Sequence, residues 1–147
     1  MGIIRILGVL LASRKLFRNW FSAGIRYYLI KHGLIDGSIT ARFRCGGERV
    51  YVLSPWVYSL IVNAYYDGLF SGLDCGDLVY LVLDYGGFRV RLHIDSVVFL
   101  GDVVRENFVG GAYDDLDVGD KTVVDVGAGV GDTAILFALR GAKGCCP

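Results

Sequence analysis

The sequence predicts an α+β region over residues 1–117, followed by the beginning of an α/β domain over residues 118–147. Three observations favour this division. Apolar side chains recur at helical spacing near the N-terminus, and two Gly-Gly pairs separate stretches with strand-like character. Near the other end, a β-branched run leads directly into a glycine-rich loop. The acidic stretch that precedes this run predicts a solvated connection between the two parts.

Composition places the chain among globular proteins with a sizeable core. It has 147 residues, of which 54% are apolar and 20% charged. The net charge is zero, but six of the fifteen basic residues precede residue 32, and all fifteen acidic residues follow it. A basic field over the whole domain is therefore absent, so we expect no nucleic-acid partner. Only the N-terminal segment carries the charge to attract phosphates or anionic lipid.

The four cysteines and two histidines predict no metal site. No two cysteines have the C-x-x-C spacing of a zinc site, and His32 and His93 are isolated in the sequence. We expect reduced thiols, as in a cytoplasmic protein, although a disulfide between Cys45 and Cys75 remains an open alternative. The other two cysteines, Cys145 and Cys146, are adjacent near the C-terminus.

Hydropathy predicts neither a membrane span nor a signal peptide. No run approaches the roughly 18–20 apolar residues that cross a bilayer as a helix. The first apolar run is followed by Arg14-Lys15 rather than by a small-residue cleavage site. Both observations favour a cytoplasmic location.

The first half predicts helices, a hairpin and another helix. Apolar residues at helical spacing over residues 3–30 predict one or two amphipathic helices that end near Gly33. Residues 39–53 alternate around Gly46-Gly47 and predict a β-hairpin. Ser54-Pro55 offers an N-cap followed by proline at the first helical position, so a helix is expected from there to Gly68.

The middle of the chain predicts a second hairpin between loops. Residues 69–76 are glycine-rich and predict a loop, while residues 77–85 and 88–94 predict a strand pair around Gly86-Gly87. Apolar and basic residues alternate in the second strand, which indicates one buried and one solvated face. Asp95 or Ser96 can cap a helix over residues 97–107, and the acidic residues Asp114, Asp115 and Asp117 follow it.

Residues 122–143 predict a buried parallel strand, a tight loop and a helix. The strand is β-branched and apolar up to Asp125, and the loop contains three alternating glycines. Glycine lets the backbone turn sharply and approach a ligand closely. The helix begins at about Asp132 or Thr133, which we expect to cap it, and its first N–H groups suit an anionic ligand group.

The spacing of these residues indicates which cofactor the loop suits. The G-x-G-x-x-G fingerprint of dinucleotide sites fails, because its last position is occupied by Asp132. The observed pattern is D-x-G-x-G-x-G, in which Asp125 precedes the first glycine by two residues. That carboxylate would repel a pyrophosphate but attract an ammonium group. S-adenosylmethionine carries an amino group, a carboxylate and a sulfonium cation, so we prefer it to NAD.

The D-x-G-x-G-x-G pattern resembles motif I of class I methyltransferases, which have a Rossmann-like α/β fold. Residues 105–143 are similar to the FkbM-type family, particularly its archaeal members. The resemblance implies S-adenosylmethionine as cofactor and methyl transfer to oxygen on a sugar- or polyketide-like small molecule. It also implies that the cofactor-binding residues are Asp125, Gly127, Ala128, Gly129 and Gly131 at the methionine-side floor, with Asp132 and Thr133 at its lip.

In such folds the next strand ends in an acidic residue that binds the ribose, roughly 20 residues after the loop. Here sixteen residues follow Gly131, and they indicate neither a second strand nor that acid. We therefore expect a chain truncated shortly after motif I, as a fragment, a disrupted gene or a frameshifted end. The chain alone is then expected to be inactive, and no catalytic residue is assigned.

A non-enzymatic reading stands beside this one. In it the chain is an α+β module whose basic amphipathic segment, residues 3–30, docks on a membrane surface or a protein partner. The glycine loop is then a structural turn only. The apolar face of the last helix is expected to pack on the N-terminal region, stay exposed or mediate self-association. It carries Ile135, Leu136, Phe137 and Leu139.

Overall fold

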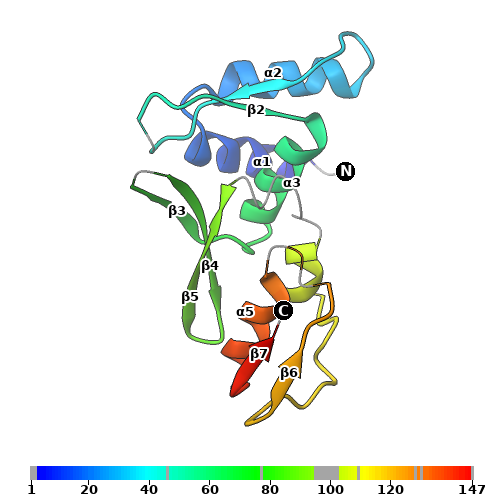
Figure 1. Cartoon of the computed structure of the whole chain (residues 1–147). Helices are drawn as coiled ribbons and strands as arrows, with labels where there is room; N and C mark the ends of the chain where they lie inside the picture. Colours follow the sequence, from blue (N-terminus) through cyan, green and yellow to red (C-terminus); the bar gives the residue numbers. More distant parts are fainter. Residues whose placement is uncertain are drawn as a thin grey trace.

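The computed structural model describes residues 3–45, 47–76, 78–94, 103–108, 110–127, 129 and 131–146. It is a mixed α+β fold with small sheets. Helices α1, α2 and α3 lie with β1 and β2 at one end of the molecule, and β6, α5 and β7 lie at the other (Figure 1). Between them stands the antiparallel sheet of β3, β4 and β5.

The N-terminal segment forms two helices, as predicted. Helix α1 spans Ile3–Leu16 and α2 spans Trp20–Lys31, ahead of Gly33. Asn19 lies between them and fastens them to the neighbouring strand. Its Nδ2 donates to the Thr40 carbonyl and its Oδ1 accepts from the Arg42 N–H, both at 2.8 Å. The amide side chain therefore extends the hairpin's hydrogen bonding to the helix pair.

The first hairpin and the third helix also follow the prediction. Strand β1, Ile39–Ala41, pairs antiparallel with β2, Tyr51–Leu53. Helix α3, Pro55–Tyr66, begins with proline in its first turn, and the Ser54 hydroxyl accepts from the Val57 N–H at 3.2 Å. This bond satisfies one of the donors that a helix start leaves unpaired.

The second sheet has one strand more than predicted. Strands β4, Val79–Tyr85, and β5, Phe88–His93, form the expected hairpin, but β3, Gly72–Cys75, pairs antiparallel with β4. The loop prediction for residues 69–76 is therefore wrong over Gly72–Cys75. The β3 sequence has low strand propensity, but β4 provides a hydrogen-bonding partner that local propensity does not report.

A disulfide joins Cys45 to Cys75, with their Cα atoms 5.7 Å apart. It links the segment after β1 to the end of β3. The expectation of reduced thiols is therefore wrong for this pair, and the open alternative is the one that the structure contains. The bond connects residues whose proximity depends on the tertiary fold, so spacing in the sequence could not identify it.

A helical segment at residues 103–108 connects the middle sheet to the C-terminal elements. It agrees with the end of the helix expected over residues 97–107, while residues 97–102 and the proposed caps Asp95 and Ser96 lie outside the described residues. Val104 and Phe108 are buried in the core. The Phe108 ring meets Tyr85 of β4 edge to face, with centroids 5.3 Å apart.

Residues 122–146 form a strand, a helix and a second strand. Strand β6, Thr122–Val124, pairs in parallel with β7, Gly144–Cys146, and α5, Asp132–Leu139, connects them. The expectation of no second strand is wrong, since β7 follows the helix directly. The parallel strand was expected to be buried, but Val124 is 70% exposed, and Val126 just beyond it is 93% exposed. With β7 as its only strand partner among the described residues, β6 is not covered on both faces.

Helix α5 packs on the rest of the molecule through part of its apolar face. Leu136 is buried in the same core cluster as Ile61 of α3 and Leu81 of β4. The Phe137 ring lies edge to face on Tyr113, at 5.4 Å. Among the three fates expected for this face, packing on the N-terminal region is therefore the one observed for Leu136.

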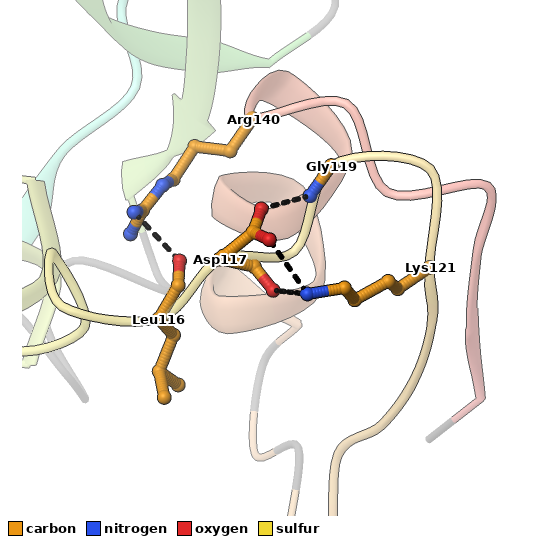
Figure 2. Close-up of polar contacts among 5 residues, drawn as sticks. All are labelled: Leu116, Asp117, Gly119, Lys121 and Arg140. Carbon is orange, nitrogen blue, oxygen red and sulfur yellow. Dashed lines mark hydrogen bonds and ion pairs between the residues drawn. The ribbon is translucent and has the colours of Figure 1, made fainter.

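Arg140 ties the connecting segment 110–121 to the end of α5 (Figure 2). Its guanidinium donates to the carbonyls of Tyr113 at 2.5 Å and of Asp114 and Leu116 at 2.9 Å. The acidic residues of this segment are exposed, as predicted. Three backbone acceptors on one side chain hold the segment without a regular element.

Candidate functional site

The glycine loop turns the chain sharply between β6 and α5. Gly127, Gly129 and Gly131 have φ values of 89°, 55° and 80°, in the left-handed region that favours glycine. A Cβ built on Gly127 or Gly131 would meet no atom within 4 Å. Backbone conformation therefore favours glycine at all three positions, and open space lies beside Gly127 and Gly131. Ala128, which the motif places in the same loop, is outside the described residues.

Asp125 is positioned by the end of β6 and reaches across the loop to α5. Its Oδ2 accepts a hydrogen bond from the Thr133 hydroxyl in the first turn of the helix. Thr133 is buried, whereas Asp125 is half-buried. No hydrogen bond to Asp125 Oδ1 occurs within the described part of the chain. The structure thus brings Asp125 and Thr133 together, with one carboxylate oxygen left for a further donor.

Asp132 takes a different place. It is the first residue of α5 and only 3% exposed, and its Oδ2 accepts from Asn107 Nδ2 at 2.5 Å. The carboxylate therefore joins α5 to the helical segment 103–108. A negative charge at a helix N-terminus is favoured by the helix dipole, and the amide donor satisfies one of its oxygens.

The start of α5 has no side-chain cap. The N-cap residue is Gly131, and neither Asp132 nor Thr133 bonds back to the first turn as we expected. That capping prediction is wrong, because the two side chains are engaged by Asn107 and Asp125 instead. Within the described residues, the first backbone bond of the helix runs from the Ile135 N–H to the Gly131 carbonyl at 3.0 Å. The N–H groups before Ile135 are those that an α-helix leaves without an internal partner.

The two halves of this site are chemically complementary to an α-amino acid. Uncapped N–H groups and the positive end of the helix dipole suit a carboxylate. The Asp125 carboxylate suits an ammonium group. Both lie at the same turn, because Asp125 contacts Thr133 directly. The arrangement therefore places an acceptor that suits an ammonium group next to backbone donors that suit a carboxylate.

The other candidate residues stay outside this site. His93, predicted to lie on the solvated face, is half-buried beside Tyr80, with ring centroids 5.6 Å apart. Nowhere in the described ranges do three or more His, Cys, Asp or Glu side chains gather to hold a metal ion. In the acidic segment, the hydrogen bond and charge of Lys121 lower the pKa of Asp117, with a smaller contribution from the Gly119 N–H (Figure 2).

The sequence analysis did not identify Asn107 and Arg140 as residues that position this part of the molecule. Asn107 is a polar residue beside apolar Val104 and Phe108 on one helical face, and that break in the pattern was the signal for a buried polar pair. Arg140 directly follows the apolar run of α5, and no feature of its neighbours indicates three carbonyl partners.

No family model matches the chain, and neither a curated protein nor a solved structure matches it. None of the helices among the described residues is long and apolar enough to cross a membrane.

Proposed function

We propose that residues 118–146 bind the methionine moiety of S-adenosylmethionine, as the N-terminal cofactor segment of a methyltransferase similar to the FkbM type. The observation that carries this proposal is the pairing of Asp125 with the uncapped start of α5. The resemblance of the D-x-G-x-G-x-G pattern to motif I supports it. In this proposal the fold around β6 is Rossmann-like, and the acceptor is a small molecule methylated on oxygen.

In this proposal the ammonium and the carboxylate of the methionine moiety each have a counterpart. The ammonium group donates to the Asp125 oxygen that Thr133 does not occupy, and the carboxylate accepts from the N–H groups at the start of α5. The open space beside Gly127 and Gly131 accommodates the carbon atoms that link the ammonium and carboxylate groups to the sulfonium. A pyrophosphate in the same position would face the Asp125 carboxylate at close range, which is why a dinucleotide fits less well.

The chemistry of the reaction assigns further roles outside this segment. S-adenosylmethionine supplies a methyl group on a sulfonium, and transfer requires an acceptor oxygen held in line with that bond. We assign no residue of the loop as the base that takes the proton from the acceptor oxygen. Their role in the proposal is to hold the cofactor's amino-acid end so that the sulfonium has a defined position.

Calorimetric titration with S-adenosylmethionine tests the proposal. We expect weak, saturable binding by the chain and no binding of NAD. Asp125→Asn keeps an oxygen for Thr133 but removes the charge, so binding should be lost. Asp115→Asn removes an exposed carboxylate from the nearby connection and should leave binding unchanged. Equal heats for Asp125→Asn and the unaltered chain, or no heat at millimolar cofactor, would overturn the proposal.

A second candidate function is docking on an anionic membrane surface. The exposed side chains of α1 and α2 favour it, because Leu7, Leu11, Phe21 and Ile25 are all exposed. Arg14 and Lys15 lie in the last turn of α1, and no hydrogen bond or ion pair of their side chains is found among the described residues. By contrast, Arg26 Nε donates to the Ser38 carbonyl at 2.5 Å and so serves the fold.

Co-sedimentation with vesicles tests this second function. The chain should pellet with vesicles that contain phosphatidylserine and remain in solution with phosphatidylcholine alone. Arg14→Glu with Lys15→Glu should abolish pelleting. The control Arg49→Glu changes an exposed basic residue outside the helices and should leave pelleting intact. Equal pelleting of both variants would exclude an electrostatic membrane surface at α1.

A further inference from the structure

A cavity of about 310 Å³ lies between helices α1, α2 and α3, which Figure 1 shows packed together at one end of the molecule. This volume is at the lower end of the roughly 300–1,000 Å³ that is usual for small-molecule sites. No residue of the glycine loop lines the cavity. Its apolar walls come from all three helices and include Ile6, Val9, Leu10 and Val62.

The polar side chains in these walls bond to one another. The hydroxyls of Ser13 and Tyr58 are 2.8 Å apart and buried. The Tyr27 hydroxyl donates to Ser59 Oγ at 3.1 Å, and Asn63 Nδ2 donates to the Ser59 carbonyl at 2.7 Å. Among the described residues, no buried side-chain nitrogen or oxygen lacks a partner. The interior therefore suits an apolar body that needs no hydrogen bonds of its own.

The mouth of the cavity has a different character. Ile6, Leu10 and Tyr28 line the cavity and are 44%, 41% and 58% exposed, so the cavity opens to the surface beside them. Lys31 and His32, at the end of α2, also line it and are exposed. None of its lining residues is acidic. A ligand that enters here meets a cation at the rim and hydrocarbon inside.

We infer that this cavity binds a single-chain anionic amphiphile, such as a medium-chain fatty carboxylate. The alkyl chain lies between Val9 and Val62, and the head group meets the Lys31 ammonium at the rim. The small volume admits one chain of moderate length rather than two. This inference rests on the three-helix cavity alone and is independent of the glycine loop.

Titration with decanoate below its micelle concentration, followed by NMR of methyl groups, tests the inference. We expect saturable binding to one site, with the largest shifts at Val9 and Val62. Decanol shares the chain but lacks the charge and should bind about tenfold more weakly, while decyltrimethylammonium should bind more weakly still. Phosphatidylcholine vesicles distinguish a free amphiphile from a membrane lipid: they should leave these methyl shifts unchanged. Linear, unsaturated shifts, or equal affinity for the three ligands, would overturn the inference.

Two variants locate the site. Gly24 lines the cavity, and a Cβ there would meet only the Tyr58 hydroxyl, at 3.8 Å, so a side chain can begin at this position without a clash and we expect Gly24→Leu to occupy part of the cavity. Leucine also has the higher helix propensity, so α2 should fold as before. We expect Gly24→Leu to abolish binding and Lys31→Gln to weaken it about tenfold. Lys15→Gln removes a cation of α1 that does not line the cavity and should bind decanoate normally. Unchanged binding by Gly24→Leu and Lys31→Gln would assign the ligand to another surface.

Discussion

The three-helix end of the molecule and the glycine-loop segment are built in different ways. In the three-helix end, Phe17, Ile39 and Ile61 are fully buried where the helices pack on the β1–β2 hairpin. The Cys45–Cys75 disulfide adds a covalent link to the neighbouring sheet. In the glycine-loop segment, β6 has three residues, pairs in parallel with β7 alone among the strands that the structure describes, and has largely exposed side chains. The glycine-loop segment is therefore held mainly through α5 and its contacts, whereas the three-helix end and its hairpin contribute most of the buried residues of the shared core. The comparison shows that the glycine-loop motif can depend on packing against the rest of the molecule for its stability.

The largest expected effect concerns the disulfide. Cys45→Ser with Cys75→Ser should lower the free energy of unfolding by about 3.5 kcal/mol, because the bond closes a loop with a sequence separation of 30 residues. Urea denaturation measures the change. A reducing agent should destabilise the unaltered chain by a similar amount and leave the double variant unaffected. Equal midpoints in all four samples would show that the bond does not stabilise the three-helix end.

A pair of substitutions separates α5 from β6 as the anchor of the glycine-loop segment. Leu136→Ala should cost about 3 kcal/mol of unfolding free energy, because Leu136 is fully buried in the shared core. Val124→Ala, on the exposed strand, should change it by less than about 0.5 kcal/mol. Thermal and urea unfolding give both values. If Val124→Ala costs as much as Leu136→Ala, the strand is packed and our comparison fails.

The buried pair Asn107–Asp132 tests the second attachment of α5. Asn107→Leu should destabilise the chain by about 2 kcal/mol, because it leaves the Asp132 carboxylate buried without that donor. Glu106→Gln changes the exposed neighbouring residue of the same helical segment and provides the control. Chemical denaturation at neutral pH measures both. A stable Asn107→Leu variant would mean that the pair does not hold the two elements together.

Tyr58 gives the three-helix end a predicted pH dependence. Burial raises the pKa of the Tyr58 hydroxyl above its usual value of 10.0; the Ser13 hydrogen bond opposes this shift, and nearby Tyr27 adds to it. The folded state therefore favours the protonated hydroxyl. Its contribution to the free energy of unfolding is fully present below pH 10 and is lost as the pH rises through the raised pKa. Tyr58→Phe should therefore be less stable by about 1 kcal/mol at pH 7, because it removes the bond to Ser13. Above pH 10 the difference should narrow, and a constant difference in urea titrations up to pH 11 would contradict this account.

The smallest expected effect concerns Asp117 in the exposed connection. Lys121 lowers the pKa of this carboxyl, so its contribution to stability is present above the usual pKa of an aspartate and is lost as the pH falls through the lowered value. Asp117→Asn should leave the free energy of unfolding at neutral pH nearly unchanged. The decrease of this free energy as the pH is lowered should be slightly smaller in the variant than in the unaltered chain, as urea denaturation at several pH values measures. A large loss of unfolding free energy at pH 7 would contradict this account. It would show that Asp117 stabilises segment 110–121 more than its exposed position predicts.

Local signals were sufficient where an element depends on its own residues. Ser54 and Pro55 fixed the start of α3, and Gly86-Gly87 fixed the turn between β4 and β5. Helical spacing identified the N-terminal helices, and the change of pattern at residue 122 identified β6 and α5. These predictions concern neighbouring residues, for which propensity and capping are informative.

Contacts between distant residues were beyond the sequence. Strand β3 exists because β4 offers its edge, and the disulfide exists because the fold brings Cys45 beside Cys75. At the candidate site, the order of strand, loop and helix was predicted, and so was the acid at the end of the strand. The inward turn of Asp132 was not, because it depends on Asn107, 25 residues away.

NMR titration of the backbone amides with S-adenosylmethionine tests the central claim most directly, because it locates the ligand as well as detecting it. We predict that the amide signals of Gly131, Asp132 and Thr133 shift most, and that Asp125→Asn removes these shifts while the spectrum of the three-helix end stays unchanged. Shifts spread over other surfaces, or the same shifts in Asp125→Asn, would contradict the assignment of the glycine loop as a cofactor site.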